Sequence, residues 1–531
     1  MFFINRLKSR SNGPVAQLGE RNVRNVEVRG SSLLRSISER FARMACKTFF
    51  YLSPIAFIQR MTTFYIETVG CQMNVLDSEL VAGLLVQHGY EPAADPKKAD
   101  ILLFNTCSVR AHAEDKIYSA LGRLKNVKDF HPERIYGVMG CMAQKDAQQI
   151  IKRCPHVDLV VGPGKIAHIP DLIEKIRAGQ TPQILISQDR RRKDQHEVAA
   201  TFEQYDPQRI AGLDEVHSPD ADPVPRFQAM LRIMLGCDNF CTYCIVPYVR
   251  GPQQSRPIGK ILDEAKQLLD NGVKEIMLLG QRVNAYKYEE NGKTYQLADV
   301  LYAMADLPGL QRLRFVTGSP SHVDTRLLET VRDIPIVCPH FHIPAQSGSN
   351  AMLKKMNRGY TVEQYRDMVS AIYSIVPGSS ITSDFIVGFC GETEEDFQQT
   401  AELVRWARFK NSYIFKYSPR EGTVSAKSWA DDVPDEVKRR RNNELLAIQN
   451  EISLADNQKF VGKTVELLVE GPSKTALKLI ASDGDNQQIQ MSGRTPCDRV
   501  GVFNGPESLA GQIVKIEVER ASNFTLFGKL V

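Results

Sequence analysis

The chain lacks the features of membrane-spanning and secreted proteins. No apolar run in its 531 residues reaches the roughly 18 residues needed to cross a bilayer. The longest candidate, FFYLSPIAFI at 49–58, is too short and contains a proline. No segment joins an apolar h-region to a cleavage site, which argues against secretion and against structural disulfides. We therefore expect a cytoplasmic protein with reduced cysteines and no membrane partner.

An excess of positive charge is confined to the first sixty residues. Residues 1–60 carry eleven Lys or Arg and three Glu, whereas the rest of the chain carries 56 basic and 59 acidic residues. The formal net charge of +5 therefore comes from the N-terminal segment. Overall charge gives no argument for nucleic-acid binding, so any contact with RNA must come from a local patch.

The segment 1–60 has no clear helical or strand periodicity. Its stretch SNGPVAQLGERNVRNVEVRGSSLLRS resembles peptides that arise when a tRNA gene is translated by mistake, and Met61 opens directly into a strand pattern. We interpret 1–60 as a non-domain extension from a mis-assigned start. An organelle transit peptide is the alternative, because the segment is rich in Arg and Ser and poor in acidic residues.

Three of the 11 cysteines are closely spaced in GCDNFCTYCIVPYVRG. Cys237, Cys241 and Cys244 have the spacing C-x3-C-x2-C. A 4Fe–4S cube normally takes four thiolates, so three thiolates leave one iron open for a ligand. A zinc or purely structural site is the alternative. Zinc prefers four ligands, however, and the chain has no second C-x2-C pair and no H-x3-H pair of finger spacing.

Residues 61–185 have the pattern of a doubly wound α/β domain, because apolar runs alternate with helical patterns. The runs are 64–69, 101–106, 135–140 and 157–162. Cys71, Cys107 and Cys141 follow the first three runs, and the carboxyl ends of parallel strands share one edge. We therefore expect these thiols to converge and to bind a second cube with one open iron. Three unrelated core cysteines are the alternative.

A polar, charged and proline-containing stretch at 186–226 predicts a linker. Six strand patterns then alternate with helical patterns over 227–457, which favours a (βα)6 partial TIM barrel. Such barrels carry their chemistry on the loops after the strands, and the C-x3-C-x2-C motif follows the first strand. Later loops hold polar residues suited to a nucleoside ligand, although ordinary turn residues are the alternative. These candidates are Gln281, Asn284, Gln346, Ser347 and Asp384.

The last segment, 458–531, contains short alternating strands and no long helix. This pattern predicts a small five-stranded β-barrel of the oligonucleotide-binding (OB-like) type. Arg494, Lys474 and Lys515 are candidates for RNA phosphate contacts. A plain structural module is the alternative, because small β-barrels serve many roles.

Residues 61–531 resemble the methylthiotransferase family, which joins an N-terminal cluster domain, a radical S-adenosylmethionine (SAM) core and a C-terminal TRAM domain. The motifs that carry the resemblance are GCQMN around Cys71, CDNFCTYCIVPYVRGPQQSRP at 237–257, QSGS at 346–349 and GETEEDF at 391–397. They are similar to the tRNA branch, which adds a methylthio group to C2 of N6-isopentenyladenosine at tRNA position 37. The chain departs from the family at Arg282 and Cys390, where Asn and Pro are usual.

The resemblance implies two 4Fe–4S clusters, one on each cysteine trio, and two SAM molecules. One SAM is the methyl donor, and the other yields the 5'-deoxyadenosyl radical at the open iron of the Cys237 cluster. The five polar candidates would bind SAM. The implied partners are the tRNA anticodon arm and an external electron donor of the flavodoxin or ferredoxin type, with the chain as a monomer.

Three alternatives to this function stay open. Related branches of the family act on threonylcarbamoyl-adenosine in tRNA or on an aspartate of a ribosomal protein. The alternative of another class is a non-catalytic, metal-containing RNA-binding protein.

Overall fold

A computed structural model describes residues 61–108, 111–187, 227–476 and 489–531. The predicted extension at 1–60 and nearly all of the predicted linker at 186–226 lie outside the described residues. Residues 61–531 form one compact unit. Within the described ranges, no helix combines the length and the apolar character needed to cross a bilayer.

The first part of the described chain is a six-stranded parallel sheet with the order β2-β1-β3-β4-β5-β6. Its strands are β1 (Thr63–Val69), β2 (Glu91–Pro92), β3 (Ile101–Thr106), β4 (Ile135–Gly140), β5 (Leu159–Val161) and β6 (Gln183–Leu185). The four apolar runs correspond to β1, β3, β4 and β5. The two edge strands are only two and three residues long, which is too short for a recognisable pattern in the sequence.

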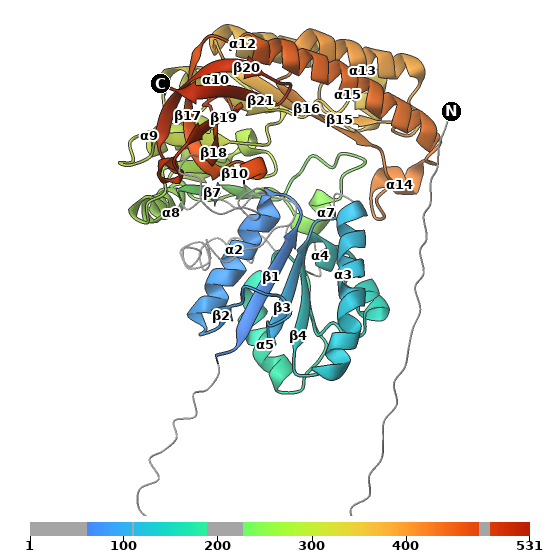
Figure 1. Cartoon of the computed structure of the whole chain (residues 1–531). Helices are drawn as coiled ribbons and strands as arrows, with labels where there is room; N and C mark the ends of the chain where they lie inside the picture. Colours follow the sequence, from blue (N-terminus) through green and yellow to red (C-terminus); the bar gives the residue numbers. More distant parts are fainter. Residues whose placement is uncertain (1–60, 109–110, 188–226, 477–488) are drawn as a thin grey trace, which may run out of the picture. The chain divides into compact units, whose positions relative to one another are not determined.

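Helices cover both faces of this sheet, as a doubly wound fold requires (Figure 1). One face packs against α2 (Gln72–Gln87) and α5 (Ile169–Arg177), and the other packs against α3 (Ala111–Phe130) and α4 (Cys141–Arg153). Every residue of β3 and β4 is buried, which is typical of central parallel strands. The predicted α/β cluster domain is therefore confirmed as a fold.

Six further parallel strands form a partial barrel. They are β7 (Gln228–Arg232), β10 (Glu275–Leu279), β13 (Arg312–Phe315), β14 (His340–His342), β15 (Ser380–Val387) and β16 (Asn411–Lys416). Two three-stranded sheets, β13-β10-β7 and β14-β15-β16, are linked by a parallel bridge between Leu313 and Val337. β7 and β16 remain at the two edges, so the barrel is open, as the sequence predicts.

Helices pack against the outer face of the partial barrel. They are α8 (Ile258–Asp270), α9 (Leu297–Ala305), α10 (Thr325–Asp333), α12 (Val362–Ile375), α13 (Glu394–Ala407) and α15 (Asp435–Gln458).

Leu231 and Ile276 share a core with α8, whereas the alternate residues Met230 and Leu279 pack with the core of the first domain. Because side chains alternate along a strand, the first domain covers the inner face of the barrel at β7 and β10.

Shorter elements complete the central part. They are β8 (Met234–Leu235), α7 (Val246–Arg250), β9 (Gln254–Ser255), β11 (Lys287–Glu290), β12 (Lys293–Gln296), α11 (Asn350–Lys355) and α14 (Val424–Ser428). β8 pairs with β9 in antiparallel fashion. This pairing brings together the two ends of the segment that contains the C-x3-C-x2-C motif.

A closed five-stranded barrel ends the chain, with the order β17-β18-β19-β21-β20. Its strands are β17 (Thr464–Pro472), β18 (Ile489–Arg494), β19 (Val500–Gly505), β20 (Ile513–Ala521) and β21 (Thr525–Leu530). The turn between β18 and β19 contacts the partial barrel, where Arg314 Nη2 donates to the Thr495 carbonyl at 2.9 Å. The predicted small β-barrel is confirmed, and it is fixed to the central part by buried hydrogen bonds.

Candidate metal centres

The carboxyl edge of the first sheet gathers three thiols. Cys71 is the residue before α2, Cys107 directly follows β3, and Cys141 opens α4 after β4. Cys107 and Cys141 are buried, whereas Cys71 keeps solvent-accessible surface. The expectation that each thiol follows a strand and that all three share one edge therefore matches their placement.

The three thiols interact electrostatically. A hydrogen bond with Cys107 lowers the pKa of Cys71 to about 6, and Arg250 and backbone N–H groups at the start of α2 act in the same direction. Burial raises the pKa of Cys141, against the effect of Arg250. Because the thiolate is the metal-binding form, the start of a helix and a nearby cation favour ligation at Cys71.

Two glycines are required by the packing behind these thiols. Gly140 has a φ of +92°, and a Cβ there would lie 2.3 Å from Asn105 Oδ1. A Cβ on Gly70 would lie 2.9 Å from Asn74 Cγ and 3.0 Å from Cys107 Cβ. Asn74 Nδ2 donates to Asn105 Oδ1 at 2.8 Å, and the Cys71 thiol donates to Asn74 Oδ1 at 3.2 Å. A buried amide pair therefore fixes the backbone from which Cys71 projects.

Two hydroxyl groups beside Cys107 suit a metal cluster. Thr106 Oγ1 and Ser108 Oγ are buried and have no hydrogen-bond partner among the described residues. Buried hydroxyls normally have partners, and the sulfurs of iron–sulfur clusters commonly accept hydrogen bonds. In the same described part, no three His, Cys, Asp or Glu side chains are grouped around a single ion position. Thr106 and Ser108 would be able to donate hydrogen bonds to the sulfurs of a cluster at this edge.

The second trio lies in the loop between β8 and α7. Burial raises the pKa of Cys237 and raises that of Cys244 to about 12, and the Cys241 thiol adds to both shifts. The three thiols are therefore close enough to influence one another. Since metal ligands must be deprotonated, binding of a cluster here would release protons.

Arg358 contacts this second trio. Arg358 Nη1 lies 3.3 Å from Cys241 Sγ. Its Nε donates to the Tyr360 hydroxyl at 3.1 Å, and its Nη2 donates to the Pro344 carbonyl at 3.0 Å. The guanidinium therefore joins the cysteine loop to the loop after β14.

Arg282, one of the two departures from the family pattern, also contacts the cysteine loop. It donates to Asn239 Oδ1, and its Nη2 donates to Gln253 Oε1 at 2.5 Å. Asn357 Nδ2 donates to the Phe240 carbonyl at 3.1 Å. These hydrogen bonds hold the cysteine loop from two sides. Arg282, whose side chain is larger than the usual Asn, provides those on one side.

The five candidates for SAM binding differ in how free their side chains are. Gln281 Oε1 is buried and has no hydrogen-bond partner in the described ranges. The side chain of Asn284, in contrast, makes two hydrogen bonds to the backbone of Ser319. Its Nδ2 donates to the Ser319 carbonyl at 2.8 Å, and its Oδ1 accepts from the Ser319 N–H at 2.7 Å. The Ser347 hydroxyl lies 3.2 Å from Thr400 Oγ1. A ligand at Asn284 or Ser347 would have to share these internal hydrogen bonds.

The remaining two candidates lie next to each other, with Asp384 in β15 and Gln346 in an isolated bridge to that strand. Gln346 has a φ of +70°, and its backbone N–H donates to the Asp384 carbonyl at 2.8 Å. Asp384 Oδ2 lies 3.5 Å from His342 Nε2. Left-handed backbone at a residue other than glycine is uncommon and often marks a functional loop. The role of all five residues in SAM binding stays a prediction.

The three candidates for RNA contacts also differ. Arg494 is paired with Glu470 at 3.0 Å and with Asp498 at 3.1 Å, so much of its charge is neutralised within the protein. Lys474 and Lys515 are exposed. The two lysines are therefore better placed than Arg494 to meet a phosphate.

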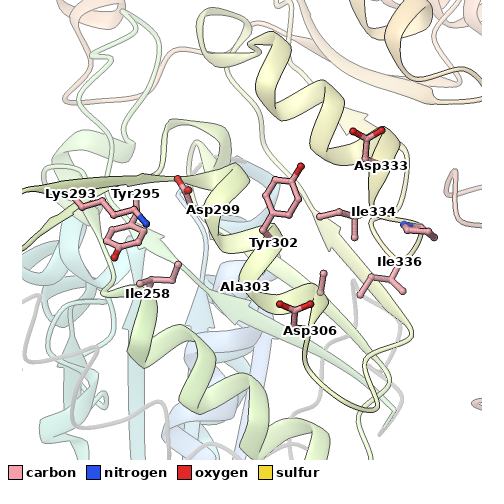
Figure 2. A pocket seen from close by; sticks show the side chains of 12 residues that line it. Ile258, Lys293, Tyr295, Asp299, Tyr302, Ala303, Asp306, Asp333, Ile334 and Ile336 are labelled. Carbon is pink, nitrogen blue, oxygen red and sulfur yellow. The ribbon is translucent and has the colours of Figure 1, made fainter.

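One surface cavity is separate from both trios. It measures about 630 Å³ and is formed by residues from α8, β12, α9 and the end of α10, including Tyr295, Tyr302 and Asp306 (Figure 2). A second cavity, of about 310 Å³, is lined by Gln253, Asn284 and other residues. Neither cavity contains a cysteine, so the thiols, rather than the cavities, define the site.

A buried ion-pair group that the sequence analysis missed lies beside the first trio. Asp77 Oδ2 accepts from Arg250 Nη2 at 2.8 Å, and Asp77 Oδ1 lies 3.4 Å from Arg232 Nη1. The side chains of all three residues are at most 4% exposed. The one signal in the sequence is the position of Arg250, six residues after Cys244.

Comparison with known proteins agrees with these observations. The chain matches the uncharacterized protein family UPF0004 over residues 63–162, the Radical SAM superfamily over 231–404 and the TRAM domain over 458–531. The fold and the C-x3-C-x2-C loop therefore define a radical SAM enzyme, a class that uses a 4Fe–4S cluster and SAM.

Two relatives are similar along most of the chain, and both are named tRNA-2-methylthio-N(6)-dimethylallyladenosine synthase. The protein from Rhodopirellula baltica is 52% identical over 89% of this chain and 96% of its own length. The protein from Moorella thermoacetica is 40% identical over 89% of this chain and 99% of its own length. The chain belongs to the tRNA-2-methylthio-N6-dimethylallyladenosine synthase family.

Proposed function

We propose that this enzyme transfers a methylthio group to C2 of N6-isopentenyladenosine at position 37 of tRNA, with two 4Fe–4S clusters and two SAM molecules. The observation that carries the proposal is the presence of two separate cysteine trios, one at the edge of the first sheet and one in the loop after β8. The names of the similar proteins specify the same nucleoside.

In this proposal the cysteines bind the clusters and the cofactors supply the radical and sulfur chemistry. Cys237, Cys241 and Cys244 would hold one cluster, with the open iron left for SAM. Cys71, Cys107 and Cys141 would hold the other. The trio of Cys237, Cys241 and Cys244 would account for SAM cleavage alone, so the additional trio of Cys71, Cys107 and Cys141 is the feature that favours sulfur transfer.

The protein residues around the trios would orient the reactants and exclude water. Arg358 donates toward Cys241, and Gln281 presents an unpartnered Oε1 near the end of β10. The first domain covers the inner face of the barrel at β7 and β10, where Met230 and Leu279 pack against it. This cover would shield a radical reaction from solvent.

The tRNA would be held in part by the C-terminal barrel. Lys474 and Lys515 are exposed there and would contact phosphates of the anticodon arm. An unpaired loop base is the type of RNA target that proteins read by splaying it out of the stack. The electron donor of flavodoxin or ferredoxin type and the monomeric state complete the proposal.

Nucleoside mass spectrometry tests the proposal. Purified, reconstituted enzyme is incubated anaerobically with SAM, a reductant and tRNA that carries N6-isopentenyladenosine. We expect the mass of this nucleoside to increase by one methylthio group in place of one hydrogen. An unchanged isopentenyladenosine, with modification of threonylcarbamoyl-adenosine or of a ribosomal protein instead, would favour the related branches. One zinc and no iron in the protein would favour a non-catalytic RNA-binding protein.

A further inference from the structure

The short helix α7 (Val246–Arg250) connects the two cysteine trios. It begins two residues after Cys244, and it packs on the first trio, because Ile245 and Val249 form one buried apolar cluster with Cys141. The short helix α7 alone therefore spans the distance from the second trio to the first.

Arg250 ends this helix and lies among the elements that carry the first trio. Its side chain is 4% exposed, and its Nη2 donates to Asp77 Oδ2 at 2.8 Å. Asp77 belongs to α2, which begins next to Cys71, whereas α4 begins with Cys141. Arg250 thus lies between the two helices whose first turns carry ligand cysteines.

The guanidinium also acts directly on the thiols. The positive charge of Arg250 acts to lower the pKa of both Cys141 and Cys71, so the guanidinium lies within electrostatic reach of the two thiols. A guanidinium has five N–H donors in a fixed plane, so one side chain can bind Asp77 and a sulfur at once. Because the preceding residue, Val249, packs with Cys141, the Asp77 carboxylate fixes the guanidinium on the side of α7 that faces the first trio.

We propose that Arg250 is a positioning residue for the cluster on Cys71, Cys107 and Cys141. Held by Asp77, it donates a hydrogen bond to the Cys141 sulfur, raises the reduction potential of that cluster and fixes its position relative to the second trio. This inference rests on the proposed function, since it requires a cluster on the first trio. Hydrogen bonds and cations near the sulfurs stabilise the more negative, reduced state of a cluster.

The experiment isolates the first cluster. Full-length protein in which Cys237, Cys241 and Cys244 are all replaced by Ala is reconstituted with iron and sulfide, and iron is counted first. About four iron atoms per chain are expected if the first trio holds a cluster. Absence of iron would contradict the proposed function itself, whatever the role of Arg250.

Arg250→Gln and Arg250→Lys are then compared in this background by a redox titration followed by electron paramagnetic resonance. We expect a more negative potential and altered g-values for Arg250→Gln, with a smaller change for Arg250→Lys, which keeps the charge. The matched control is Arg232→Gln, which removes the guanidinium next to Asp77 Oδ1 and leaves the pair between Arg250 and Asp77 Oδ2 in place. It should leave the potential close to that of the parent.

The outcomes separate positioning from general packing. Loss of iron from Arg250→Gln but not from Arg232→Gln would also support the inference. Cluster binding would then require Arg250, which is proposed to contact the sulfur, and would not require Arg232. An unchanged potential in both Arg250 variants would overturn it. The same shift, or the same loss of iron, in Arg232→Gln would overturn it too, since the effect would then belong to domain packing.

Discussion

Arg358 lies with Nη1 3.3 Å from the sulfur of Cys241, although the two residues are 117 positions apart in the chain. Its other donors are bound to Pro344 and Tyr360, so the guanidinium has little freedom to turn away. The middle thiol of the C-x3-C-x2-C motif therefore carries a fixed cationic neighbour before any cofactor binds.

This interaction predicts that Arg358→Gln weakens iron binding at the second trio. Removal of a partner that hydrogen-bonds a metal ligand typically lowers metal affinity about 10–100-fold. The measurement is the release of iron to a chelator, in protein that keeps only the second trio. Arg366→Gln is the control, because Arg366 stacks on Trp406 of the neighbouring helix. Equal release from both variants would show that the hydrogen bond to Cys241 has no such role.

The two trios should have separable functions. Cys241→Ala should abolish cleavage of SAM, because the second trio would no longer present an open iron. Cys107→Ala should leave cleavage of SAM intact and stop sulfur transfer. Both products, 5'-deoxyadenosine and the methylthio nucleoside, are measured in the same reaction, with Cys154→Ala as the control from outside the trios. Continued sulfur transfer by Cys107→Ala would refute the role given to the first domain.

His340 predicts a pH dependence of stability. Burial lowers its pKa from 6.5 to about 3 and outweighs the attraction of Asp498 at 3.9 Å. Between these two values the unfolded chain binds a proton that the folded chain does not. Stability should therefore fall as the pH falls below 6.5, by about 1.4 kcal/mol per pH unit from this residue alone.

The measurement for His340 is urea unfolding at several values between pH 5 and 8. His340→Gln, which can keep a hydrogen bond to Thr382, should show a shallower loss of stability toward acid than the original chain. His131→Gln, at an exposed position, is the matched control. Parallel pH profiles for His340→Gln and the original chain would contradict the argument.

The C-terminal barrel predicts different effects for its basic residues. Lys515→Ala and Lys474→Ala should weaken tRNA binding. Each phosphate that no longer has a lysine partner should make the slope of log K against log salt concentration shallower by about 0.7–0.9. Arg494→Ala should instead lower the unfolding midpoint, because it removes the partner of Glu470 and Asp498. Filter binding over a salt series separates the two effects, and an unchanged slope for both lysine variants would exclude their binding to phosphates.

The sequence could predict the thiols because their placement depends on local patterns. Cys107 and Cys141 follow long apolar strands, and parallel strands bring their carboxyl ends to one edge. The spacing of Cys237, Cys241 and Cys244 is likewise local. The partial barrel and the small β-barrel followed from the repetition of strand patterns.

The partners of the thiols could not be predicted in this way. Arg250 pairs with Asp77 across 173 residues, so the ion pair depends on how two distant segments pack together. Asn284 and Ser347 were selected as polar loop residues, yet both make internal hydrogen bonds that depend on the packing of distant loops. Tertiary packing, rather than local pattern, decides whether a polar side chain is available to a ligand.

The most direct test of the account is an iron count on anaerobically reconstituted, full-length protein and on variants that lack one trio. The account predicts about eight iron atoms per chain, and about four when either trio is replaced by alanines. About four iron atoms in the original chain, unchanged when Cys71, Cys107 and Cys141 are replaced, would contradict it.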